Sequence, residues 1–170
     1  MKIIEAMKKI KNLEEKAVDL QKKVALHCAD LSYEQPVYPD QKQVVAGWIQ
    51  AQHDLLKECE KLRVAIQKTN LNTPVTIELD GVQVTKSIAE WVLRRRLYAK
   101  MEEGIWNSLN DRGLKEGITD GTAGQKIEVK IRRYFDPVLR DEKRELYRSE
   151  PSVIDSTLEV VNAVIDLIED

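Results

Sequence analysis

The chain has 170 residues, a formal net charge of −2, 33% charged residues and only 5% aromatic residues. This charge balance disfavours a general nucleic-acid-binding protein, which needs a basic excess to neutralise phosphates. No apolar run approaches the roughly 18 residues of a membrane-spanning helix, and the charged N-terminus is unlike a signal peptide. Two cysteines do not make a disulfide framework, so we expect a soluble intracellular protein.

The first predicted element is a helix from Met1 to Leu31, because apolar residues recur there at a mean spacing of about 3.5. Its apolar stripe comprises Ile3, Met7, Ile10, Leu13, Ala17, Leu20, Val24, Cys28 and Leu31. Pro36 and Pro39 end this helix or lie in the connection after it. Asp40 then offers an N-cap for a second helix that runs to about Lys68. Because the connection is short, the two helices are predicted to form an antiparallel hairpin.

The second helix carries its own stripe, which consists of Val44, Trp48, Ala51, Leu55, Cys59, Leu62 and Ile66. The hairpin geometry places Cys28 and Cys59 roughly 20 Å apart along the axis. A disulfide needs Cα atoms within about 7 Å, so we predict no intrachain bridge. His27 and His53 are separated in the same way, so we expect no zinc site within one chain.

A β-hairpin is predicted after the second helix, with Asp80-Gly81 as its two-residue turn. The apolar residues that alternate with polar ones along its strands are Val75, Ile77, Leu79, Val82 and Val84. A third helix, capped by Thr85 or Ser87, is predicted to reach about Asp111. Its stripe comprises Ile88, Val92, Arg95, Tyr98, Met101, Ile105 and Leu109.

The run Arg94-Arg95-Arg96 lies within the third helix and has two interpretations. It could bind phosphate, but neighbouring side chains on a helix point about 100° apart, which favours separate ion pairs with different carboxylates. The glycine-rich loop 112–125 contains no phosphate-binding motif. We interpret it as mobile or as ordered by a partner chain.

Alternation of apolar and charged residues predicts a half-buried strand from Ile127 to Tyr134. Asp136 and Pro137 mark a break, which leads either into a short charged helix or through a turn into another strand, and the pattern leaves residues 138–147 open between the two. A last helix is predicted after Pro151 and carries a seam of Leu158, Val161, Ile165 and Ile168. Its broad apolar face indicates packing against the hairpin or a neighbouring subunit.

These elements predict a mainly α protein with a small β element. Residues 1–69 are expected to form the coiled-coil-like helical hairpin. Residues 70–170 would contain the β-hairpin, the third helix, the glycine-rich loop, the strand and the C-terminal helix, packed as one domain with the first part. The β-hairpin and the strand from Ile127 would form a small antiparallel sheet with edges open to another chain.

Several segments resemble a family of small bacterial and phage-encoded helical proteins described as septicolysin-like. They are the opening MKIIEAMKKIKNLEEKAVDLQKK, residues 66–71, the step from Asp80 to Thr85, and Tyr147 to Glu150 followed by Pro151-Ser152-Val153 and Asp155. The glycine-rich loop and the segment from Tyr134 to Pro137 depart from the family pattern. The resemblance implies a long helical hairpin, a small β element and oligomerisation, and it implies no catalytic residues.

The candidate site residues are therefore interface residues rather than catalytic ones. The apolar candidates are Val75, Ile77, Leu79, Val82, Val84, Ile127, Val129, Ile131, Leu158, Val161, Ile165 and Ile168. The basic candidates are Arg94, Arg95, Arg96, Arg132, Arg133, Arg140 and Arg144. Acidic residues are interleaved with the arginines from Arg132 onward, which favours salt bridges between subunits over nucleic-acid binding. The carboxylates occur as adjacent pairs on charged helical faces, and no base is expected near either thiol, so no cofactor, metal or catalytic group is predicted.

The sequence favours a non-enzymatic structural protein. We expect it to form a homo-oligomer and to contact other proteins of an assembly. The family resemblance adds a place as an accessory component of a phage virion, and otherwise we expect the cytoplasm. An intracellular adaptor or nucleic-acid-associated factor that uses the arginines is the alternative. A membrane-acting protein, as the family label implies, is the third hypothesis, although no segment is predicted to insert in a membrane.

Overall fold

The structure, a computed structural model, describes residues 1–169. Asp170, the last residue of the predicted second part, lies outside the described residues. The chain divides into two compact units. The first contains Met1–Pro74, Ser87–Ala89 and the residues from Leu158 onward, and the second contains Val75–Lys86 and Glu90–Thr157. The predicted second part therefore contributes residues to both units.

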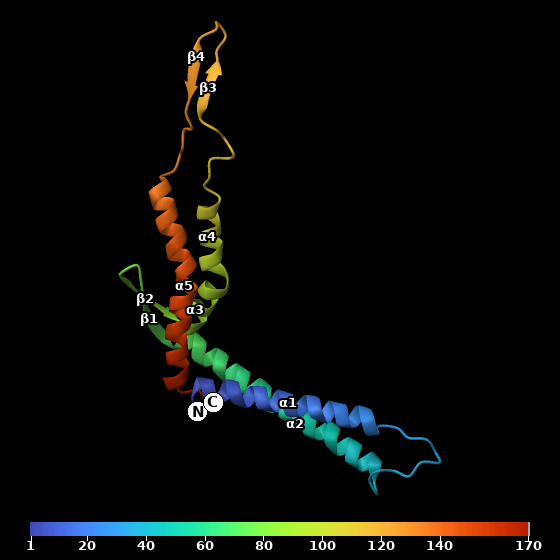
Figure 1. The fold of residues 1–170 in the computed structure, drawn as a ribbon. Coiled ribbons are helices and arrows are strands. Elements are labelled where there is room, and N and C mark those ends of the chain that lie inside the picture. Colours follow the sequence, from blue (N-terminus) through green and yellow to red (C-terminus); the bar gives the residue numbers. More distant parts are fainter. Residues whose placement is uncertain (170) are drawn as a thin grey trace. The chain divides into compact units, whose positions relative to one another are not determined.

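In the first unit, α1 (Ile3–His27) and α2 (Gln41–Asn72) form an antiparallel helical hairpin and run side by side in Figure 1. The predicted cap is present, since the Gln43 N–H donates to Asp40 Oδ1 at 3.1 Å. The buried residues of α1 are Ile3, Ala6, Ile10, Leu13 and Ala17. Cys59 of α2 is buried opposite them, with its Sγ 4.0 Å from the Ile10 carbonyl oxygen.

The seam of this hairpin differs from the predicted stripe at both ends of α1. The helix ends at His27, whose carbonyl accepts from Gln41 Nε2 at 3.0 Å, so Leu31 lies in the connection and is exposed. Near the N-terminus Ala6 is buried while Met7 is exposed. A straight helix has about 3.6 residues per turn, so a stripe with a period of 3.5 moves off the buried face.

The first residues of the chain contact residues 165–168 in the same unit. The Leu167 N–H donates to the Met1 carbonyl at 2.8 Å, and the Ile168 N–H donates to Oγ1 of the fully buried Thr69 at 2.9 Å. The prediction that the last helix extends to Ile168 is therefore wrong at its end. These backbone groups bond to other segments of the unit instead of continuing the helix.

β1 (Pro74–Leu79) and β2 (Val82–Ser87) form the predicted β-hairpin of the second unit. Asp80 and Gly81 have φ of 52° and 73°, the positive values that a type I′ turn requires. The indole N–H of the buried Trp91 donates to the Val75 carbonyl at 2.9 Å, which fixes the hairpin to the following helix.

The third predicted helix forms with an irregular turn in its middle. It consists of α3 (Ile88–Leu93), the π-helix η1 (Arg94–Tyr98) and α4 (Ala99–Asn107). A π turn closes hydrogen bonds one residue further along the chain than an α turn, which rotates the side chains that follow. Ala99 is therefore buried and Trp106 half-buried, whereas the predicted stripe residues Tyr98, Met101 and Ile105 are exposed.

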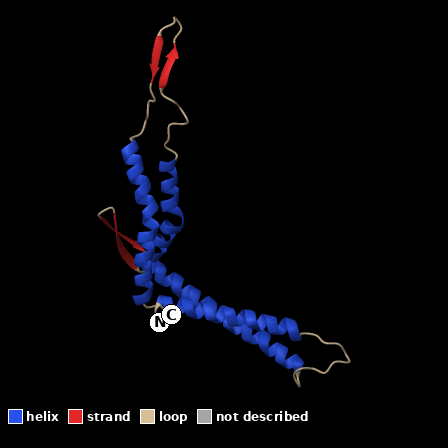
Figure 2. Cartoon of the chain, viewed as in Figure 1, coloured by secondary structure: helices blue, strands red, loops and turns tan. Residues whose placement is uncertain are grey.

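A second β-hairpin replaces most of the predicted glycine-rich loop. β3 (Gly117–Asp120) pairs with β4 (Lys126–Val129) in an antiparallel sheet, visible in Figure 2 as a pair of red arrows beyond the helices of this unit. The predicted single sheet of the first hairpin and the strand from Ile127 is therefore wrong, since each described sheet has two strands. Gly124, with a φ of 73°, supplies the tight turn that brings β3 back to β4.

α5 (Pro137–Val164) resolves the open assignment of residues 138–147 as helix. Asp136 caps it, because its Oδ1 accepts from the Val138 N–H at 2.9 Å, and Pro137 occupies the first helical position. The helix continues through Pro151, where the sequence analysis expected a new helix to begin. The fold is thus mainly α with a small β element, as predicted.

Candidate interaction surfaces

The chain exposes more apolar side chains than it buries. Among the described residues, 28 large apolar side chains are exposed and 14 apolar residues are buried. The accessible surface is 12589 Å². A compact protein of 19.6 kDa is expected to expose about 8,600 Å², and two separate domains of half that mass only about 10,300 Å². A large accessible surface with many exposed apolar side chains is typical of a protein that contacts other proteins.

A regular apolar surface begins at the end of α3 and continues along the outer face of η1 and α4. Leu93, Leu97, Met101 and Ile105 follow one another at intervals of four residues and are 47%, 50%, 68% and 66% exposed. We call these four residues the α4 stripe. Gly104 is exposed next to it, and a side chain there would meet nothing within 4 Å, so a second helix could approach closely. The four-residue spacing is visible in the sequence, but the exposure of these four side chains depends on the π turn.

A second row of exposed apolar residues runs along α2. It consists of Ile49, Leu56, Val64 and Leu71, at intervals of about two helical turns. These residues alternate along the helix with the seam residues that pack on α1. The hairpin therefore carries apolar side chains on more than one face, as helices in the interior of larger bundles do.

The predicted interface residues divide into buried and exposed groups. Val75, Ile77 and Leu158 are buried within the chain itself, so these residues do not lie on an open surface. Leu79, Val84, Ile131, Val161 and Ile165 are half-buried. Val82, Ile127, Val129 and Ile168 are exposed. The β-hairpin of β1 and β2 is thus mainly a packing element, and apart from Val82 the exposed strand residues among these candidates belong to β4.

A buried charged cluster joins η1 to α4 and α5. Glu150 is 2% exposed, and its carboxylate accepts from Arg94 Nε and, at 2.9 Å, from Arg94 Nη2. Arg94 Nη2 also donates to Glu102 at 2.5 Å, and the guanidinium lies 5.9 Å from the centre of the Tyr147 ring. The hydrogen bonds to Glu150 and then to Glu102 raise the pKa of Arg94. Burial raises the pKa of Tyr147, with a further contribution from the Glu102 charge.

Most of the other predicted basic residues also have carboxylate partners in the same chain. Arg95 pairs with Asp155, and Arg133 donates to both oxygens of Asp111 at 2.7 and 2.6 Å. Arg140 and Arg144 both pair with Asp141, at 2.9 and 3.4 Å. Arg96 and Arg132 are exposed. Arg94 and Arg95 therefore bind different acids, as the helical geometry predicted for this run, whereas Arg140 and Arg144 share Asp141. All of these acids belong to this chain rather than to a neighbouring subunit.

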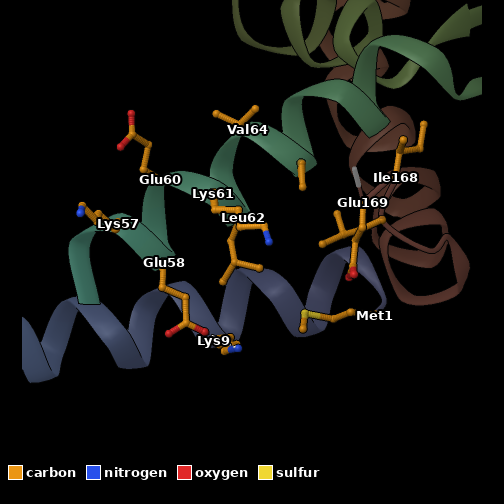
Figure 3. Close-up of a pocket in the computed structure, with 12 residues that line it drawn as sticks. Met1, Lys9, Lys57, Glu58, Glu60, Lys61, Leu62, Val64, Ile168 and Glu169 are labelled. Carbon is orange, nitrogen blue, oxygen red and sulfur yellow. Dashed lines mark ion pairs between the residues drawn. The ribbon is translucent and has the colours of Figure 1, made fainter. Parts of the chain in front are cut away.

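An open groove of about 520 Å³ lies in the first unit, between the start of α1, α2 and the C-terminal segment. Figure 3 shows its lining, with Leu62 between α1 and α2 and charged side chains around it. Lys9 Nζ and Glu58 lie 2.6 Å apart across the two helices. An apolar floor with an ion pair at its rim resembles the edge of a helix-packing surface.

The two thiols lie in different environments, since Cys28 is exposed and Cys59 is buried. Burial and then the Glu14 charge raise the pKa of Cys59, which disfavours the reactive thiolate. Among residues 1–169, no cluster of three or more potential metal ligands is present. In the same range, every helix is too short or too polar to span a membrane.

Comparisons of the chain with protein-family models, with curated protein sequences and with solved structures found no match. The surfaces described above are therefore the basis on which function is inferred.

Proposed function

We propose that this chain is a non-enzymatic structural protein that assembles with copies of itself. The observation that carries the proposal is the α4 stripe, a continuous apolar row along three helical segments with no covering element in the described chain. Four side chains at i, i+4 spacing are the arrangement through which helices pack against other helices. Burial of such side chains contributes roughly 1.5–3 kcal/mol each, which favours association.

The charged residues support a structural function. Arg94 binds both Glu102 and Glu150 and thereby holds three helical segments together. Arg133 and Asp111 join the two segments that lead into and out of the β3–β4 hairpin. These groups act as internal connections, and the exposed remainder of the chain is rich in apolar side chains suited to protein contacts.

The resemblance to septicolysin-like proteins supports a place as an accessory component of a phage particle. Within this proposal, the chain joins other proteins of the assembly and is located in the virion, or in the cytoplasm before assembly. A gene neighbourhood of head and tail proteins would support this location, and a neighbourhood of unrelated metabolic genes would contradict it.

The α4 stripe can be tested by light scattering on purified full-length variants. Met101→Glu places a charge in the stripe and is expected to lower the mass of the particle toward that of a monomer, with unchanged helix content by circular dichroism. Val138→Glu is the matched control, because Val138 is equally exposed on a helix of the same unit but lies outside the stripe. An unchanged mass for Met101→Glu would contradict the use of this surface.

A further inference from the structure

The free edge of β4 is the most specific surface on the molecule, because its pairing preference can be read from its register. In the β3–β4 hairpin, Gly117 pairs with Val129 and Thr119 with Ile127. The Gly121 N–H donates to the Gln125 carbonyl at 2.7 Å, so the odd-numbered residues of β4 direct their backbone groups toward β3. The backbone groups of Lys126 and Glu128 therefore point away from β3, and extension of the strand by one residue would direct those of Lys130 the same way.

A two-stranded hairpin with such an edge is rarely stable alone in water, and its exposed edge is a template for another strand. The strand has two chemically different faces. Within β4, which ends at Val129 rather than at the predicted Tyr134, Ile127 and Val129 alternate with Lys126 and Glu128. Lys130 and Ile131 follow the strand and continue the same alternation of residue types. A row of lysines alone would repel a second copy of the strand. Glu128 between two lysines instead permits attractive pairing between copies.

From this edge we infer that β4, extended through Lys130 and Ile131, pairs antiparallel with the same segment of a second copy, with a two-fold axis at Val129. This inference rests on the proposed function and names one of its contacts. In this register Glu128 of each copy lies opposite Lys130 of the other copy, which gives two such pairs. At both pairs the backbones of the two strands exchange hydrogen bonds. Val129 lies opposite its own symmetry mate, with Ile127 opposite Ile131 on each side. Shifting one strand by two residues, which centres the axis on Glu128, would place that carboxylate opposite itself and is disfavoured.

The register can be tested by cysteine cross-linking in the full chain. Cys28, the exposed thiol, is first replaced by serine in every variant. In a non-hydrogen-bonded antiparallel pair the Cα atoms are about 4.5 Å apart, which lies within the range of a disulfide. Val129→Cys is therefore expected to give a disulfide-linked dimer under mild oxidation. Ile118→Cys is the control, because Ile118 is more exposed than Val129 (73% against 40%) but lies on β3.

Charge reversal provides a second test in the Val129→Cys background. Glu128→Lys places like charges opposite each other and is expected to lower the cross-linked fraction several-fold. The double variant Glu128→Lys/Lys130→Glu exchanges the two charges and is expected to restore it. Failure of the double variant to restore cross-linking would overturn the register.

Amide hydrogen exchange on the unmodified protein gives a readout that needs no substitution. The outward N–H groups of Lys126, Glu128 and Lys130 are expected to exchange slowly, and those of Ile118 and Asp120 on the free edge of β3 to exchange fast. Equal exchange at both edges, or cross-linking of Ile118→Cys as efficient as that of Val129→Cys, would overturn the pairing. If the protein is oligomeric but shows neither the slow exchange at the β4 edge nor the cross-link at Val129→Cys, the strand pairing is wrong and the proposed function stands. A monomeric protein would contradict both.

Discussion

At the scale of single residues, the pair of Arg94 and Glu150 explains why a carboxylate lies in the interior of the chain. A buried charge is tolerated only when its hydrogen bonds are satisfied, and the fork of the guanidinium matches both oxygens of Glu150. Tyr147 and Glu102 complete the surroundings of Arg94. The cluster fixes the side of α5 that faces η1.

Glu150→Gln is expected to lower the free energy of unfolding by about 2 kcal/mol, because Arg94 would lose its ionic partner while retaining Glu102. Glu145→Gln on the same helix is the control, and since Glu145 is well exposed it should change stability by no more than about 0.5 kcal/mol. Urea unfolding of both variants at one protein concentration measures the difference. Equal effects would show that the buried pair contributes no more than a surface charge.

A second residue-scale prediction concerns Asp111, whose pKa is held below its ordinary value by the hydrogen bonds from Arg133. A depressed pKa means that the ionised carboxylate stabilises the folded state above the unfolded pKa, near 3.8, and that this contribution is lost as the pH falls through the folded pKa. An NMR titration of the carboxyl carbon should show protonation of Asp111 below that value. In Arg133→Gln the titration should return toward 3.8. The same curve in both proteins would contradict the assignment.

At the scale of elements, the hairpin of α1 and α2 and the β1–β2 hairpin could be predicted because their signals are local. The period of the apolar residues, the Asp40 cap and the Asp80-Gly81 turn each act within a few residues. The π turn, the passage of α5 through Pro151 and the pairing of β4 with β3 could not. Each depends on a distant partner, such as Glu150 for Arg94, or on a glycine-rich segment that becomes a strand only when β4 lies beside it.

The π turn predicts an asymmetric response to deletions. Removing Arg96, an exposed residue within η1, should let the turn relax to an α turn and keep Trp91 and Ala99 on the packed face, with a stability within about 1 kcal/mol of the parent. Removing Lys100, an exposed residue of α4, should rotate the rest of α4 by about 100° and cost more than 2 kcal/mol. Urea unfolding of the two deletion variants distinguishes them. Equal losses of stability in the two variants would contradict the interpretation that η1 contains one residue more than an α turn needs.

At the scale of the whole molecule, the same phase shift that buries Ala99 creates the α4 stripe. Sequence periodicity placed Met101 and Ile105 toward the interior, and the structure places them on the surface. Several interface candidates in β1, β2 and the last helix are buried or half-buried within the chain. Ile127 and Val129, in contrast, are exposed as an interface requires. More apolar residues are exposed than buried, and together with the α4 stripe this supports the proposal that the chain is a subunit of an oligomer.

That claim is tested most directly by the mass of the unmodified protein in solution. Light scattering coupled to size-exclusion chromatography, repeated over a range of protein concentrations, should give a particle whose mass is a multiple of 19.6 kDa. Even-numbered assemblies are expected if β4 pairs across a two-fold axis. A single species of 19.6 kDa at every concentration, stable and without aggregation, would contradict the account.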